Sequence, residues 1–249
     1  MGNLVKAEWF KLAKSLGYKI LITCCICTGI LFSVIAATGD QKLSAYDVLT
    51  SCIDMLIVHS IFGNTFAAVF IGSEFKNHTF GNSLLNGQPR QKLFLAKIIV
   101  FFAGFFLMLF ITWLVTVVIV SYYNGFGMDF SLGTCKNILL LFLYVLTGYM
   151  AFGAVIILMF TIIRKEAVTV AAGILFTYVY LFARTNLQGI YFLRYTFFYQ
   201  IELMAFSINK KYNFGGDVFS GGLYFAVTIL TFITALVLSV WCFKRMELK

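Results

Sequence analysis

The stretch Ile98–Val120, IIVFFAGFFLMLFITWLVTVVIV, holds no charged residue. An α-helix needs about 20 consecutive apolar residues to cross the roughly 30 Å hydrocarbon core of a bilayer. Lipid offers no hydrogen-bond partner to backbone amides, so a run of this kind in a membrane has to be helical. The stretch therefore predicts a transmembrane helix.

The composition of the whole chain points the same way. Its 249 residues are 61% hydrophobic and only 12% charged, whereas soluble domains are about 45–50% apolar and about 25% charged. We expect one all-α membrane domain over residues 1–249, with six transmembrane helices. The predicted spans are residues 20–37, 53–72, 98–120, 138–163, 167–183 and 223–243.

The basic residues indicate which way the chain is threaded. A net charge of +9 would suggest nucleic acid for a soluble protein, but in a membrane protein it marks cytoplasmic loops and anionic headgroups. With the N-terminus inside, thirteen of the 19 Lys and Arg residues fall in inner segments and six in outer ones. We therefore predict two cytoplasmic termini, membrane lipids as partners and no nucleic acid.

The N-terminal residues 3–16 read as an amphipathic helix on the inner membrane surface. Val5, Trp9, Leu12 and Leu16 recur at helical spacing. Basic residues lie on the other side, and Trp9 suits the headgroup level. The expected surface anchors are Lys6, Trp9, Lys11 and Lys14. The alternative is a plain extension of the first span.

Residues 74–92, EFKNHTFGNSLLNGQPRQK, form a polar interruption between the second and third spans. A short helix is expected up to Leu85, with a stop at Asn86-Gly87. Pro89 suits the first turn of the helix that becomes span three. The apolar side chains in the segment indicate a contact surface for a cytoplasmic protein. These side chains are Phe75, Phe80, Leu84 and Leu85.

Two further segments lie between spans. Residues 164–166, Arg-Lys-Glu, predict a tight inner turn that makes spans four and five antiparallel neighbours. The outer segment 185–222 is rich in aromatic residues, including Tyr191 and Phe198. It predicts short helices that dip into the outer leaflet.

Motifs for catalysis do not occur. The sequence has no Gly-x4-Gly-Lys-[Ser/Thr] phosphate loop, no His-Glu-x-x-His and no cysteine–histidine cluster at zinc spacing. We expect no enzyme activity, cofactor or metal on this chain. Polar residues inside the spans are candidates for a substrate path, or alternatively form packing and interhelical hydrogen bonds. The path candidates are His59, Asn64, Thr112 and Thr116, with Tyr191 and Phe198 outside.

One pattern around the polar interruption is similar to a known family. The order Glu74, Gly81, Leu84-Leu85, Pro89-Arg90 and Lys97 resembles the permeases of ABC-2 type transporters. The chain departs from the family in having Asn82 where Thr is usual and Arg90 directly after the proline. Size and span layout extend the resemblance over essentially the whole chain. It looks closest to the small permeases of bacterial lantibiotic and peptide-antibiotic immunity or export systems.

The resemblance implies a half-transporter in the bacterial cytoplasmic membrane. Its partners would be a second permease chain, identical or homologous, and a pair of separate ATPases that bind ATP and Mg. The segment 74–92 would be the coupling helix, and residues 164–166 a smaller contact. The implied coupling residues are Glu74, Phe75, Phe80, Gly81, Leu84, Leu85, Gly87, Pro89, Arg90, Arg164, Lys165 and Glu166.

The expected function is ATP-driven export of a hydrophobic or amphipathic substrate, such as a peptide antibiotic. Three alternatives stay open: an exporter of a drug or lipid, a self-contained channel or proton-coupled carrier, and a non-transporting immunity protein that sequesters a peptide.

Overall fold

The structure is a computed structural model that describes residues 1–39, 42–51, 56–73, 89–129, 131–186, 196 and 221–245. Every regular element in these ranges is a helix, as predicted. The α-helices are α1 (Gly2–Lys14), α2 (Leu16–Thr38), α3 (Ala45–Ser51), α4 (Leu56–Ala67), α7 (Arg90–Asn124), α8 (Leu132–Ile163), α9 (Glu166–Asn186) and α11 (Gly221–Arg245). A π-helix, η1 (Ala68–Gly72), continues α4 directly.

Four of these helices are long and apolar enough to cross a membrane. They are α2, α7 from Gln91, α8 and α11. They contain the predicted first, third, fourth and sixth spans, and make the chain a multi-pass membrane protein. The second and fifth spans stay predictions: α4 with η1 covers residues 56–72 of the described chain, and the apolar part of α9 is the shorter stretch Ala167–Val179.

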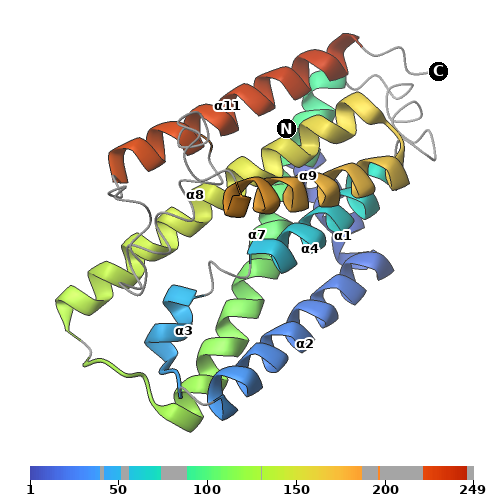
Figure 1. Ribbon diagram of the computed structural model, residues 1–249. Helices are drawn as coiled ribbons and strands as arrows, with labels where there is room; N and C mark the ends of the chain where they lie inside the picture. The colour runs from blue at the N-terminus through green and yellow to red at the C-terminus, as the bar shows by residue number, and fades with distance from the viewer. Residues whose placement is uncertain are drawn as a thin grey trace.

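The helices form two close pairs with smaller elements between them (Figure 1). In the first pair α2 runs parallel to α7. Tyr18 donates a hydrogen bond to the carbonyl of Gly104 at 3.1 Å, and Thr116 donates to the carbonyl of Gly29 at 3.3 Å. Gly29 permits this approach, because a Cβ there would lie 3.1 Å from the Thr112 carbonyl oxygen. These contacts fix α2 along the length of α7.

The second pair is α8 with α11. The Tyr224 hydroxyl donates a hydrogen bond to the carbonyl of Tyr144, and the two rings meet edge to face at 5.2 Å. One end of α11 also touches α7, where Phe94 and Phe243 stack at 4.3 Å. The beginning of α7 therefore lies beside the C-terminal end of α11 (Figure 1).

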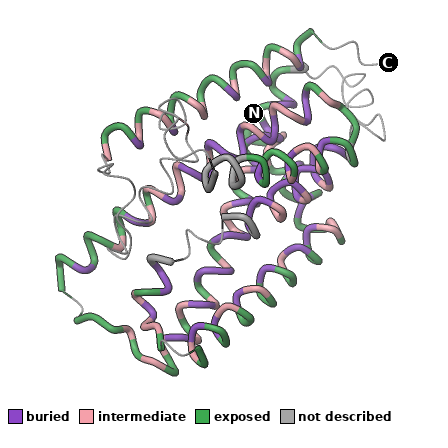
Figure 2. The backbone as a smooth tube through the Cα atoms, in the orientation of Figure 1, coloured by how far each residue is buried: buried purple, intermediate pink, exposed green. Residues whose placement is uncertain are grey.

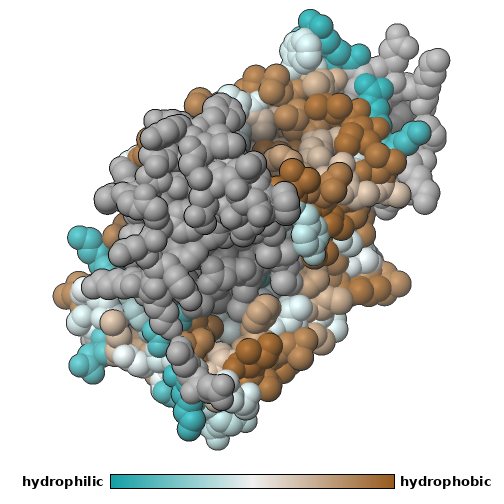
Figure 3. All heavy atoms as spheres, viewed as in Figure 1, coloured by the Kyte–Doolittle hydropathy of each residue, from teal (hydrophilic) through white to brown (hydrophobic). Residues whose placement is uncertain are grey.

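The core lies between the two pairs, where α4, η1 and α9 pack (Figure 2). Phe66 of α4 stacks on Phe101 of α7 with ring centroids 5.0 Å apart. The outer sides of α2 and α11 remain exposed although they are apolar; Ile35 and Leu230 are 65% and 64% exposed. Apolar side chains cover much of the visible described surface, with hydrophilic residues near its two ends (Figure 3). This distribution suits a bilayer around the middle of the bundle.

Helix α3 was not predicted from the sequence. Ser44 and Asp47 form a reciprocal cap: the Asp47 amide donates to Ser44 Oγ at 3.2 Å, and the Ser44 amide donates to Asp47 Oδ2 at 3.1 Å. This is a capping box with Asp in the place of Glu. Val48 and Leu49 are buried, and α3 packs on α7. The Ser-x-x-Asp spacing was the signal that could have located this helix.

Candidate functional site

Helix α1 packs against α7 and is part of the helix bundle. Its Leu12 is 1% exposed, in a space that exists because residue 104 of α7 is glycine. The helix ends at Lys14, and Ser15 caps the next helix, so the expected single helix 3–16 is wrong at its C-terminal end. Leu16 belongs to α2 and is 73% exposed. The cause is the Ser15 side chain, which accepts the Tyr18 amide at 3.4 Å and starts a new helix.

Glu8 is the acidic residue that α1 turns toward the core. Both Glu8 and Lys97 of α7 are buried, and Lys97 Nζ lies 2.8 Å from Glu8 Oε2. Lys11 Nζ lies 2.5 Å from the other carboxylate oxygen. A buried carboxylate is costly unless it is paired and hydrogen-bonded. Lys11 and Lys97 supply this pairing. The ion pair between Glu8 and Lys97 fixes α1 to the first turns of α7.

Lys97 also holds the π-helix η1. Its Nζ donates to the carbonyl of Phe70 at 3.3 Å and lies 4.1 Å from the centroid of the Phe70 ring. Carbonyls in the last turn of a helix lack intrahelical donors, and a cation there is favourable. One lysine thus joins α1, η1 and α7, at a point one turn before residue 74 and two turns after Pro89. We call Glu8, Lys97 and Phe70 the charge cluster.

The charge cluster makes a pH-dependent contribution to stability. Burial by itself raises the pKa of Glu8, but the charge of Lys97 and hydrogen bonds from Lys11 and Lys97 outweigh it, so the pKa lies below its ordinary 4.5. A lowered folded-state pKa gives stability that is complete above about pH 4.5 and is lost as pH falls through the folded-state value.

We expect Glu8→Gln to melt below the wild type at neutral pH, with a difference that shrinks in more acidic buffer. Thermal midpoints in detergent from about pH 7 to about pH 3 measure this; an unchanging difference would contradict it.

Most of the predicted coupling residues fall outside the described ranges. Glu74, Phe75, Phe80, Gly81, Leu84, Leu85 and Gly87 are in this group. Pro89 is described, and it is the N-cap of α7: its carbonyl accepts the amides of Lys92 and Leu93 at 3.0 and 3.2 Å. The prediction that a helix starts here and becomes span three is confirmed within one residue, since α7 begins at Arg90.

The tight turn predicted at residues 164–166 is present and is one residue shorter than expected. Helix α8 ends at Ile163 and α9 begins at Glu166. Arg164 has a left-handed backbone with φ of 60°, and its amide donates to the Phe160 carbonyl at 3.1 Å. This αL cap reverses the chain within two residues. The turn lies at the same end of the bundle as the last residues of α11 (Figure 1).

The expected surface anchors are all exposed on α1. Trp9 is 39% exposed, and Lys14 Nζ lies 4.3 Å from the centroid of the Phe10 ring. Lys6 and Lys11 are also exposed, although Lys11 turns back to Glu8. Their contact with membrane lipid stays a prediction.

The predicted path residues divide into separate groups. Thr112 and Thr116 are buried between α2 and α7, where each hydroxyl shares its one proton between a carbonyl of its own helix and a carbonyl of α2. This favours the interhelical hydrogen-bond role over a place on the path. Tyr191 and Phe198 lie outside the described residues.

His59 and Asn64, both on α4, are buried near other helices. The Tyr149 hydroxyl of α8 is 3.1 Å from His59 Nδ1, and the two rings are edge to face at 5.6 Å. Asn64 is 0% exposed, and its amide has no hydrogen-bond partner among the described residues. It lies directly against Gly173 of α9. A buried amide without a partner is costly, so this position needs a functional or structural reason.

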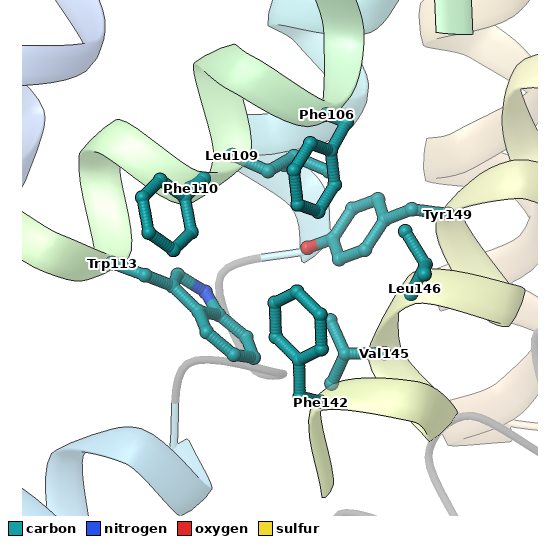
Figure 4. Close-up of a pocket in the computed structure, with 8 residues that line it drawn as sticks. All are labelled: Phe106, Leu109, Phe110, Trp113, Phe142, Val145, Leu146 and Tyr149. Carbon is teal, nitrogen blue, oxygen red and sulfur yellow. The ribbon is translucent and has the colours of Figure 1, made fainter. Parts of the chain in front are cut away.

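A groove between α7 and α8 adjoins the His59–Tyr149 pair (Figure 4). We call it the aromatic groove, lined by Phe102, Ala103, Phe105, Phe106, Leu109, Phe110, Trp113, Phe142, Val145, Leu146, Tyr149 and Met150. The larger part of the groove has a volume of about 310 Å³. The volume is at the low end of the roughly 300–1,000 Å³ of small-molecule sites. None of these lining residues is charged.

Comparison with known families assigns most of the chain to a family of transporter proteins. The profile described as "ABC-2 family transporter protein" matches residues 4–184. The chain belongs to this family. A search of the curated proteins and of the solved structures gives no significant match. The matched range of this ABC-2 protein runs from α1 through α9 and contains both the charge cluster and the aromatic groove.

Family membership carries three consequences. An ABC-2 permease is a multi-pass membrane subunit, it is not itself catalytic, and it associates with an ABC ATPase. Among the described residues no group of three or more His, Cys, Asp or Glu side chains gathers to hold a metal.

Sequence reasoning missed the acidic residue of the charge cluster, Glu8, and much of the aromatic groove. Glu8 is the only acid among the lysines of α1, three residues before Lys11, and that isolation was the available signal. In the groove, Phe102, Phe106, Leu109 and Trp113 recur at i, i+4, i+7 and i+11, which marks one face of α7. Nothing in the sequence pairs that face with Tyr149.

Proposed function

We propose that this protein is the membrane half of an ATP-driven exporter that moves a hydrophobic or amphipathic substrate. It spans the bacterial cytoplasmic membrane six times with both termini inside. It assembles with a second permease chain, identical or homologous, and with two ATPase subunits that carry ATP and Mg. A peptide antibiotic as the cargo stays a prediction from the resemblance to immunity and export permeases.

The observation that carries the proposal is the position of Lys97. It binds the last turn before residues 74–88 through Phe70 and the surface helix α1 through Glu8, and it belongs to the helix that follows Pro89. A force applied to the segment between η1 and α7 would reach three helices through one side chain. In our proposal residues 74–92 are the coupling segment that sits on the ATPase, and residues 164–166 form the second contact.

The ATPase contact is tested by charge at the proposed docking leucines. We expect Leu84→Glu/Leu85→Glu to abolish co-purification of the ATPase, because two carboxylates replace apolar contacts at the interface. The tagged permease is purified from cells that express its neighbouring genes, and the associated ATPase is identified by its phosphate-loop sequence and by ATP hydrolysis. The double variant should still elute as a folded membrane protein.

A matched control is Leu132→Glu, at the end of the bundle away from the start of α7 and the Arg164 turn (Figure 1). Leu132 is the first residue of α8 and is 93% exposed. This variant should keep the ATPase. If the Leu84/Leu85 variant also keeps it, residues 74–92 are not the coupling segment; if no ATPase associates with the wild type, the exporter proposal fails.

A further inference from the structure

The aromatic groove is elongated along α7. Two adjoining cavities of about 310 and 20 Å³ share Phe106, Leu109, Leu146 and Tyr149 as lining residues. From Phe102 to Trp113 the lining extends over about 16 Å of helix, at 1.5 Å per residue. The larger cavity lies toward Phe102 and the smaller one toward Trp113. This shape suits a chain-like molecule.

Among the lining side chains of the groove, Trp113 carries an N–H group and Tyr149 a hydroxyl group. In Figure 4 the Trp113 indole nitrogen and the Tyr149 hydroxyl both point into the space between the helices. Tyr149 is bonded to His59, whereas Trp113 Nε1 has no partner among the residues that the structure describes. Trp113 is 8% exposed, and an indole N–H is only a donor. A buried donor without a partner calls for an acceptor from outside the protein.

One side of the aromatic groove is open to the outer surface of the helix bundle, along α7. Phe110 is 43% exposed and Ala103 is also exposed, both on the α7 face that borders the cavities. Because α7 is one of the helices long and apolar enough to span, this opening lies at the level of the bilayer. An occupant can enter sideways from the lipid.

We propose that the aromatic groove binds an uncharged, single-chain acyl compound from the bilayer. Its carbonyl oxygen accepts the Trp113 Nε1–H, and its hydrocarbon chain extends toward Phe102. That the compound is cargo rests on the proposed function; that it binds does not. The site thus favours an exporter of lipid-like molecules over an exporter of cationic peptides, because no lining residue offers a counter-charge.

Binding is measured on the purified chain through Trp113 itself. The chain has three tryptophans; Trp9 and Trp241 are 39% and 49% exposed, so Trp9→Phe/Trp241→Phe leaves Trp113 as the reporter without disturbing the core. Bromine quenches tryptophan fluorescence on contact. The probes are methyl dibromostearate, which has a carbonyl, and dibromooctadecane, which lacks one. We expect saturable quenching by both, with about three- to tenfold tighter binding of the ester.

A second variant separates the hydrogen bond from the cavity. Trp113→Phe keeps an aromatic ring but removes the donor, so the ester should lose its preference and bind like the bromoalkane in a thermal-shift titration. Trp241→Phe alone is the control and should leave the preference intact. Leu146→Trp, which fills the larger cavity, should weaken both probes.

The outcomes separate the two proposals. Quenching that does not saturate, or equal affinity for the two probes in the reporter protein, overturns the acyl site; equal affinity means that a bound water satisfies Trp113. If Trp113→Phe does not fold, the comparison in the reporter protein still decides. Selective binding of the ester without ATP-dependent release from the assembled transporter leaves the site standing and refutes the acyl compound as cargo, whereas the exporter function itself fails only if no ATPase associates with the permease.

Discussion

Lys97→Met is expected to destabilise the folded protein severely. The substitution leaves Glu8 buried with only the partly exposed Lys11 as a described counter-charge. Removing one member of a buried pair costs roughly 3–5 kcal/mol, and Lys11 keeps the expected loss near the lower figure. In a chain of this length the thermal midpoint should fall by about 6–12 °C, measured by size-exclusion chromatography after heating in detergent.

Two further variants identify the cause of this loss. Lys97→Met/Glu8→Gln removes the uncompensated charge and should recover much of the midpoint, because an amide is cheaper to bury than a carboxylate. Lys92→Met, on the same helix but exposed, should change little. If the double variant is no more stable than Lys97→Met, the charge of Glu8 is not what Lys97 compensates.

The charge cluster should also affect the coupling between cargo binding in the membrane and ATP hydrolysis by the ATPase. In the double variant the helices still pack, but Lys97 no longer joins α7 to α1 through an ion pair or to η1 through the Phe70 carbonyl. We expect the ATPase to remain bound while cargo-dependent stimulation of its ATP hydrolysis decreases. Stimulation equal to that of the wild type would limit Lys97 to a role in stability.

The features that could be predicted from the sequence are helices and turns encoded by residues close together in the chain. Apolar runs long enough to cross a bilayer predict α2, α7, α8 and α11, and Pro89 marks the start of α7 within one residue. The Arg164 turn follows from the few residues between two apolar runs. Such features are encoded in neighbouring residues, so they can be recognised without knowing which helices meet.

Features that need two distant segments could not be predicted in this way. Glu8 and Lys97 are 89 residues apart, and Tyr149 and His59 are 90. Composition suggested that the lysines of α1 face headgroups, but it could not show that the acid among them faces α7. Thr112 and Thr116 are ambiguous for the same reason: a threonine on a span lines a path or bonds a helix according to which helix packs beside it.

Gly173→Ala is the second substitution with a large expected effect. Its new Cβ would overlap the carboxamide oxygen of Asn64, which is completely buried. Overpacking of this kind costs about 1–3 kcal/mol. Gly222→Ala in α11 is the matched control, because a Cβ there meets nothing within 4 Å. The control should be neutral or slightly stabilising, since alanine favours helix over glycine.

Asn64→Ala should rescue the Gly173→Ala variant. Alanine at residue 64 removes the overlapping oxygen, so the double variant should melt near the wild type. The effects of the two substitutions on the thermal midpoint should therefore not add. Asn64→Ala alone should be no less stable than the wild type, because it deletes a buried amide that has no partner among the described residues. Thermal midpoints of the four proteins form the cycle; additive losses would mean that the two side chains do not meet.

The cycle also tests Asn64 as a path residue. A side chain that costs stability in one conformation can be favoured in another state or by a ligand, and substitutions that relieve such a cost commonly reduce function. We therefore expect Asn64→Ala to fold at least as well as the wild type but to show weaker stimulation of the ATPase by cargo. If stimulation is unchanged, Asn64 takes no part in the path, and its amide is a packing element against Gly173.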